Sequence, residues 1–348
     1  MKSNHYKTFY FIALTLCLSS CTPLLYTSLD ILRPAKVAFS PEATSLVFVN
    51  NSIPQPADIG HTTTLLNETT KNISVQSDSA ATVCTQTLFD EINDKNFFNS
   101  TKIVKKSINK GKDFNTTPSL LPQQIKSLCT KHGTLGILTL DKIKISDQLV
   151  ENFIPERGVY LPTLELICET QWSIYYAEKS DNSTIHFKDT IYWETESYFR
   201  EKALQELPRR EDAILEAARF VGNKCVNRFV PYWDKVDRYF YNSKNKGMKK
   251  GMDSVYVKNW KAAINNWETV LNSTKKTTLK AQAANNIAIC YEIIGDVSKA
   301  LEYANTAYYN FGLQTIIDLE TLNRSSNYLI ELSQRKKEID ALKKQLGE

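Results

Sequence analysis

The chain has 348 residues, of which 42% are hydrophobic and 23% charged, and its net charge is +5 at pH 7. This length favours two domains, and so mild a positive charge argues against a nucleic-acid-binding protein, whose contact surface is strongly basic. Two lysine-rich stretches, residues 102–112 and 244–250, are expected to be solvated segments and not phosphate-binding sites.

The N-terminus carries the pattern of an export signal. Lys2 and Lys7 precede an apolar run over residues 9–18, which is too short to remain as a membrane span. Leu-Ser-Ser then stands directly before Cys21, an order that resembles the lipobox of bacterial lipoproteins. The resemblance implies cleavage before Cys21 and acylation of this residue, with fatty acyl chains such as palmitate that hold the protein on a membrane. An ordinary signal peptide followed by a chance cysteine is the alternative.

Two segments follow from this interpretation. Residues 1–20 are predicted to be the signal peptide, and their removal takes away Lys2 and Lys7 but no acid, which lowers the net charge to +3. Residues 21–42 contain three prolines and are predicted to be a lipidated tether.

Residues 43–243 alternate strand and helix signals and are predicted to form a mixed-sheet α/β domain. Continuous apolar runs at 46–49 and 135–140 are typical of strands buried on both faces, and the second is expected to leave the core at Asp141. The intervening residues predict two helices and a short strand, and Gly133 ends the second helix.

The rest of this domain begins with a predicted hairpin. Residues 164–176 and 185–193 alternate apolar and polar side chains, and residues 179–182 supply turn-forming types between them. A helix is expected over 214–225, and a final strand is expected from Pro231 through Phe240.

The cysteines suggest neither a disulfide framework nor a metal site. Five remain after Cys17 is removed and Cys21 is acylated, and an odd number leaves at least one free thiol. Each lies on an apolar face, where cysteine behaves as a small hydrophobic residue. One disulfide bridge, for example between Cys84 and Cys129, is compatible with an oxidising envelope.

From residue 244 to 348 every signal is helical, and the stretch 280–307 resembles the tetratricopeptide repeat. Tyr291, Gly295, Ala300 and Ala307 match the large, turn, small and small positions that let two helices of a repeat pack closely. A preceding repeat is degenerate, and the tail over 328–346 is expected to pack back on the repeats.

The resemblance also implies a binding groove. In tetratricopeptide repeats the outward positions of the first helix line a concave surface, and in this chain they are Gln282, Asn285, Asn286, Ile289 and Glu292. The sequence thus predicts a groove for an unknown envelope protein or peptide, in which the paired asparagines bond to a peptide backbone. Ordinary exposed polar residues on a helix are the alternative.

Catalytic chemistry is hard to find in the sequence. His61, His132 and His186 lie in unrelated segments, and no phosphate loop, nucleophile elbow or metal-ligand spacing occurs, so we expect neither a cofactor nor a metal. Acidic pairs such as Glu194 with Glu196, or 90–91, are the residue types that glycoside hydrolysis uses, although solvated faces explain them as well.

Taken whole, the chain resembles a family of Bacteroides-type lipoproteins with an N-terminal α/β domain and C-terminal tetratricopeptide-like repeats, an α+β architecture. The resemblance implies lipid anchoring to the outer membrane, on the periplasmic face because no acidic cluster follows Cys21. The predicted function is a non-enzymatic, membrane-anchored protein-interaction module. An envelope glycan-binding or glycan-hydrolysing lipoprotein is the alternative.

Overall fold

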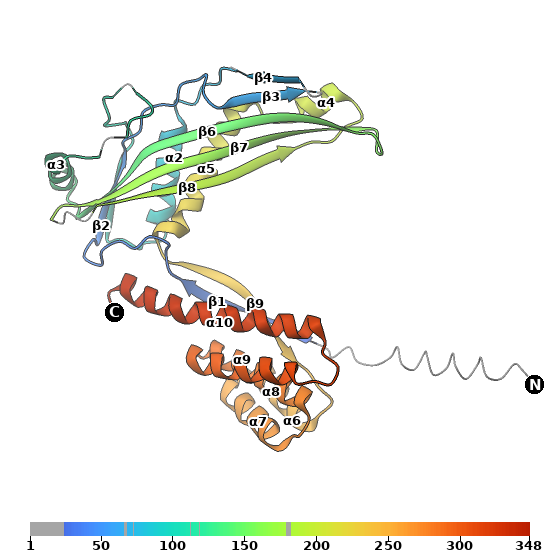
Figure 1. The fold of residues 1–348 in the computed structure, drawn as a ribbon. Coiled ribbons are helices and arrows are strands. Elements are labelled where there is room, and N and C mark those ends of the chain that lie inside the picture. The colour runs from blue at the N-terminus through green and yellow to red at the C-terminus, as the bar shows by residue number, and fades with distance from the viewer. Residues whose placement is uncertain (1–23, 66–67, 72, 112, 118, 179–181) are drawn as a thin grey trace, which may run out of the picture. The chain divides into compact units, whose positions relative to one another are not determined.

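The computed structural model describes residues 24–65, 68–71, 73–111, 113–117, 119–178 and 182–348, which form two compact units (Figure 1). We call residues 35–231 the sheet unit, and residues 24–34 together with 232–343 the helical unit. The fold is mixed α+β, as the sequence predicts. None of the helices in the described residues has the length and apolar character that a membrane crossing requires.

A long central strand organises the sheet unit. The first half of β6 (Gly136–Ile154) pairs in parallel with β2 (Ser45–Asn50), which pairs in parallel with β5 (Ser100–Val104). The second half of β6 pairs in parallel with β3 (His61–Leu65), which is followed by β4 (Glu68–Lys71). The other edge of β6 pairs antiparallel with β7 (Val159–Tyr176), and β7 pairs with β8 (Ser183–Glu194). The sheet is therefore mixed, and the predicted hairpin is its β7–β8 pair.

The strand predicted over 135–140 does not end at Asp141. The β6–β7 register shifts between Leu140 and Lys142, which is the mark of a β-bulge. Before the bulge the strand is buried on both faces, and after it Ile143 and Ile145 point inward while their neighbours face outward. Burial along β6 changes from continuous before the bulge to alternating after it. The sequence of the second half therefore does not continue the apolar run of the first, and the strand predicted from that run is too short.

Helices cover the sheet unequally on its two faces. Helices α2 (Ala80–Asp94) and α5 (Arg210–Phe229) pack with β2, β6 and β7 in the main core, whereas α3 (Pro122–His132) packs in a smaller cluster on Val47, Val49 and Ile137. Short helix α4 (Arg200–Gln205) precedes α5. Successive residues of β2 alternate between the two clusters, so these lie on opposite faces of the sheet.

The two faces of the sheet determine whether Cys84 and Cys129 can form a disulfide. Cys84 lies in the main core and Cys129 lies under α3, on the opposite face, so the bridge considered between them is excluded. All five cysteines of the described chain are free and buried. Gly133 ends α3 with φ +64, as predicted, because this left-handed conformation suits glycine.

The helical unit begins with a strand that the sequence analysis missed. Strand β1 (Leu24–Arg33) pairs antiparallel with β9 (Tyr232–Tyr241) over its full length. The predicted tether over 21–42 is therefore wrong for its strand-forming part. Strand β9 packs with the helices, so the compact helical unit includes residues 232–241, which lie before the predicted boundary at 243/244. Cys21 and the predicted signal peptide lie outside the described residues.

Five helices complete this unit. They are α6 (Lys246–Tyr256), α7 (Trp260–Ser273), α8 (Thr277–Ile293), α9 (Val297–Gly312) and α10 (Leu319–Leu346). Short connections make the first four an antiparallel series, and Trp267 on α7 donates to the carbonyl of Met248 on α6 at 3.2 Å. Every residue of α8 from Ala281 to Cys290 is buried, which makes α8 the centre of the unit. The tail helix packs back on this core through Tyr328 and Leu332.

Candidate functional site

The helix face predicted to be a groove is filled by the chain itself. Gln282, Asn285, Asn286, Ile289 and Glu292 are all buried. Asn286 accepts from the backbone N–H of Tyr241 at 2.7 Å and donates to its carbonyl at 2.8 Å, and Asn285 donates to the carbonyl of Tyr239 at 3.2 Å. The paired asparagines thus bond to a peptide backbone, but that backbone is β9. The prediction that these five residues line an open groove is wrong.

A buried ion pair seals the same face further along α8. The carboxylate of Glu292 accepts two hydrogen bonds from Arg238 on β9, at 2.7 and 2.9 Å, and a third from the hydroxyl of Tyr328 on α10 at 3.0 Å. Burial acts to lower the pKa of Arg238, but its bonds to Glu292 outweigh this and hold the pKa above its usual range. Strand and tail helix together leave no room for a partner peptide on this face.

The residues matched to repeat packing occupy the α8–α9 hairpin. Ala300 and Ala307 are fully buried in the helical core, and Gly295 adopts φ +87 in the connection between the two helices. Tyr291 stacks on Tyr303 of α9 with ring centroids 5.5 Å apart. Packing between α8 and α9 is therefore enough to explain why these residues stand at these positions, and no ligand is required.

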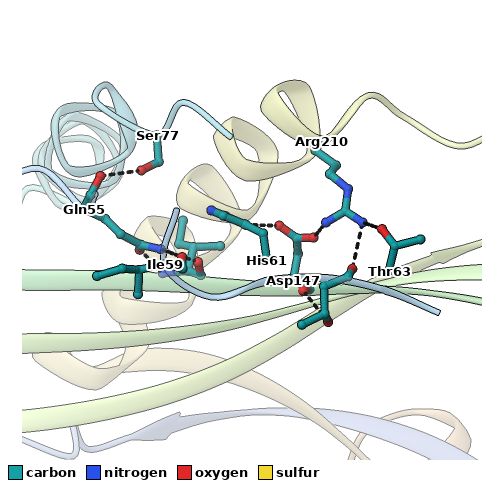
Figure 2. A network of polar contacts seen from close by, with 9 residues as sticks. Gln55, Ile59, His61, Thr63, Ser77, Asp147 and Arg210 are labelled. Atoms are coloured by element: carbon teal, nitrogen blue, oxygen red, sulfur yellow. Dashed lines mark hydrogen bonds and ion pairs between the residues drawn. The ribbon is translucent and has the colours of Figure 1, made fainter. Parts of the chain in front are cut away.

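A buried histidine and a carboxylate meet in the sheet unit. His61 begins β3, and parallel pairing places it opposite Asp147 on β6. Figure 2 shows His61 and Arg210 both pointing toward the carboxylate of Asp147, with Nδ1 of His61 on one oxygen and the guanidinium of Arg210 on the other. Arg210, the first residue of α5, also donates to the carbonyl of Thr62 at 2.8 Å. The network therefore joins β3, β6 and the start of α5.

The electrostatics of this network favour a structural role. Burial, and then the charge of Arg210, lower the pKa of His61, so its imidazole is neutral at pH 7. Its Nε2 is buried and has no hydrogen-bond partner in the described part of the chain. Both side chains of the pair are sealed from solvent, so a substrate has no path to them. We assign the pair to holding β3 against β6.

A second buried carboxylate lies at the bulge of β6. Asp141 accepts hydrogen bonds from Asn51 at 3.0 Å, Thr139 at 2.7 Å and Ser173 at 2.5 Å. Burial raises its pKa, and these three bonds oppose the rise. Because Asp141 is the extra residue of the bulge, its hydrogen bonds fix the point where β6 changes its phase.

The acids considered for glycoside hydrolysis have ordinary surface partners. Glu196 pairs with Arg157, Glu194 accepts from Thr163 at 3.4 Å, and Asp90 accepts from Gln86 at 2.6 Å within α2. None of them lines the pocket described next. No cluster of three histidine, cysteine or acidic side chains suited to a metal ion occurs among the described residues.

The open face of β6, β7 and β8 carries a pocket with a cavity volume of about 650 Å³. Two cross-strand rows form its floor. Lys142, Gln171 and His186 make one row, and Lys144, Glu169 and Lys188 make the next. Adjacent strands lie about 4.8 Å apart and the rows about 7 Å apart, so six polar side chains share a floor about 10 Å wide. We call this site the sheet-face pocket.

The wall and the charge of the sheet-face pocket both suit a polar ligand. Phe114 and Asn115 form a wall, and the ammonium of Lys142 lies 4.5 Å from the centroid of the Phe114 ring. Three lysines face a single carboxylate on the floor, and the 3.5 Å contact between Lys144 and Glu169 is exposed, so this pair adds little stability. The floor therefore keeps an excess of positive charge at pH 7.

Comparison with known families gives two matches. Residues 43–241 match a family described as Domain of unknown function (DUF8603), and residues 249–334 match one described as Domain of unknown function (DUF6340). The first match covers more than half of the chain. The chain belongs to the DUF8603 family. A comparison with curated proteins finds no match.

The DUF8603 region contains the sheet-face pocket and the His61 network, and it ends at the last residue of β9. Sequence analysis missed both features because each joins residues that are distant in sequence and are paired by the sheet. A partial signal was present. Lys142 and Lys144 alternate with Ile143 and Ile145, which is the pattern of a strand with one wet face, and extending the strand past Asp141 would have revealed it.

Proposed function

We propose that this protein is a lipid-anchored envelope lipoprotein whose sheet unit binds a carboxylate-bearing glycan in the sheet-face pocket. The two polar rows on β6, β7 and β8 carry the proposal, because they gather three lysines, an amide and an imidazole on a rigid, concave floor. Sites built on strands hold their side chains more firmly than sites on loops. The repeat face of α8 is no longer a candidate, since β9 fills it.

The chemistry of the pocket favours an acidic sugar over a neutral one. Lysine ammonium groups attract carboxylates, while the amide of Gln171 and the ring of His186 offer donors and acceptors for hydroxyl groups. Further along β8, the exposed Tyr192 lies on the same face and extends the platform with an aromatic ring. A chain of sugars bound along the strands can contact both the lysine rows and this tyrosine.

Binding is better supported than hydrolysis. Glycosidases use two carboxyl groups on either side of the scissile bond. Glu169 is the single carboxylate among the described residues that line the pocket, and Lys144 lies against it. We therefore assign the pocket to recognition, in keeping with the non-enzymatic role expected from the sequence.

The anchor rests on the lipobox. Acylation of Cys21 explains why a basic start, a short apolar run and Leu-Ser-Ser precede it, and the lack of an acidic cluster directly after Cys21 favours the periplasmic face of the outer membrane. Metabolic labelling with a fatty-acid analogue tests the anchor. The wild-type chain should incorporate the label and Cys21→Ser should not, whereas equal labelling of both would refute it.

The pocket is tested by cosedimentation with purified cell-wall sacculi, whose peptide stems carry carboxylates. The chain from residue 22 onward should sediment with them, and Lys144→Gln/Lys188→Gln should bind about tenfold more weakly. The matched control is Lys105→Gln/Lys106→Gln, which removes the same charge from exposed lysines outside the pocket. Amidation of the carboxylates on the peptide stems of the sacculi should weaken binding to the same degree. Equal binding by both double variants would overturn the proposal.

A further inference from the structure

One end of the helical unit brings together segments that are far apart in sequence. Strand β1 begins there, with Leu24 opposite Tyr241, and the ring of Tyr241 lies 5.4 Å from Phe311 near the end of α9. At the start of α10, the guanidinium of Arg324 lies 5.2 Å from the Tyr239 ring. The α9–α10 connection, residues 313–318, is therefore placed beside the start of β1, as Figure 1 also shows. We call this the anchor end.

The antiparallel helices bring two more segments to the anchor end. The start of α6 follows β9 closely, and the backbone of Gly247 lies against Val270 near the end of α7. The α7–α8 connection follows Val270 within a few residues, so it also lies at this end.

The connection between α9 and α10, at the anchor end, exposes several large apolar side chains to solvent. Four large apolar residues lie in or next to the α9–α10 connection, and Ile316 is 87% exposed. The four are Leu313, Ile316, Ile317 and Leu319. Its two acids are already engaged, since Asp318 accepts from the hydroxyl of Thr321 at 2.8 Å and Glu320 pairs with Arg324. Contiguous exposed apolar residues of this kind mark interaction sites.

Several lysines lie at the same end of the helical unit as this apolar connection. Six exposed lysines lie at the start of α6 and in the α7–α8 connection, and none of them forms an ion pair in the described part of the chain. The six are Lys244, Lys246, Lys249, Lys250, Lys275 and Lys276. Apolar side chains and lysines exposed at one end of a unit form the pattern of a surface that lies in a membrane interface. The sequence predicts only that residues 244–250 are solvated, and the structure places them at the anchor end.

The length of chain before β1 identifies the membrane as the occupant. Only Thr22 and Pro23 separate Cys21 from Leu24, and the three extended steps from Cys21 to Leu24 span at most about 11 Å. We infer that the anchor end docks on the phospholipid bilayer, with the apolar side chains of Leu313, Ile316, Ile317 and Leu319 among the acyl chains and the lysines on the lipid phosphates. This inference rests on the proposed acylation of Cys21, which holds the start of β1 within this distance of the bilayer.

Docking is tested on a chain that lacks Cys21 and therefore the acyl chain. A negative result then speaks against docking and not against lipidation. The chain from residue 22 onward has five buried cysteines, so Ile316→Cys supplies a single accessible thiol for an environment-sensitive fluorophore. Val257→Cys is the matched control, because Val257 is 74% exposed in the α6–α7 connection, at the other end of the antiparallel helices. The probe is a vesicle of phosphatidylethanolamine and phosphatidylglycerol.

The expected result is a blue-shifted, brighter emission from the label at position 316 when vesicles are added, and no change at position 257. In vesicle flotation, Ile316→Asp/Ile317→Asp should reduce the bound fraction about tenfold, and Lys246→Gln/Lys249→Gln should reduce binding and its dependence on salt. Both pairs are exposed, so the variants should fold as the wild type does. An unchanged emission at position 316, or equal flotation of Ile316→Asp/Ile317→Asp and wild type, would overturn the inference even if Cys21 is acylated.

Discussion

Asn286 offers the sharpest test of the claim that β9 fills the repeat face of α8. In Asn286→Ala, the backbone N–H and carbonyl of Tyr241 lose the side-chain partner that holds both of them. Asn286 is fully buried, so water reaches these groups poorly. An unsatisfied buried polar group costs roughly 1–3 kcal/mol, and two such groups with partial relaxation give a loss of about 2–4 kcal/mol.

The assay is equilibrium unfolding in urea, followed by circular dichroism. With a slope of about 2 kcal/mol per molar urea, the midpoint of the transition that reports the helical unit should fall by about 1–2 M. Asn265→Ala is the control, because Asn265 is exposed on α7 and alanine is the better helix former there. Hydrogen exchange at the Tyr241 amide should also quicken in Asn286→Ala. Equal midpoints for the two variants would refute the reasoning.

Three further predictions address other parts of the molecule. The lowered pKa of His61 means that the unfolded chain takes up a proton below pH 6.5 that the folded chain resists, so stability should fall as the pH drops from 7 toward 5. His61→Gln should flatten that part of the profile of unfolding free energy against pH, and an unchanged slope would contradict the assignment. Gly251→Ala should lower the melting temperature, since a Cβ would meet the Trp267 ring at 2.1 Å, whereas Gly312→Ala has open space and should not. Burial raises the pKa of Cys168 to about 12, and the other four thiols of the described residues are buried as well. In the chain from residue 22 onward a thiol reagent should therefore react only on unfolding; modification at the rate of a free thiol would show that the cores open.

The parts of the fold that follow from local patterns could be predicted from the sequence. Continuous apolar runs gave β2 and the start of β6, and strict alternation gave the β7–β8 hairpin. These patterns report burial directly, because side chains alternate between the faces of a strand. Helices α7 to α9 followed in the same way from their apolar positions.

The pairing of β1 with β9 had no such signal, because it joins residues about 200 positions apart. Strand β1 itself could have been found. Leu25, Leu29 and Ile31 alternate with the outward Ser28 and Asp30, and prolines directly before and after the strand made the segment look like a tether. The prediction for residues 24–33 followed the proline content and not the alternation of apolar and polar residues, so β1 was not recognised as a strand of the helical unit.

The predicted groove is absent because α8 is buried on all sides. The resemblance to tetratricopeptide repeats supplied the idea of an outward face, yet α8 has almost no polar side of its own. Small or apolar residues surround Gln282, Asn285 and Asn286 on every side. A helix that is apolar all round is buried all round, and its few polar residues then bond to backbone inside the protein.

The proposed binding surface is the open face of β6, β7 and β8, and photo-crosslinking in intact cells probes that surface in place. A photoreactive phenylalanine analogue replaces His186 in the sheet-face pocket, and in the control it replaces the exposed Asn265 of the helical unit. We expect a crosslinked product of high mass from position 186 alone, and its mass should fall on digestion of the cell-wall glycan. A product that resists this digestion, or equal products from both positions, would contradict it.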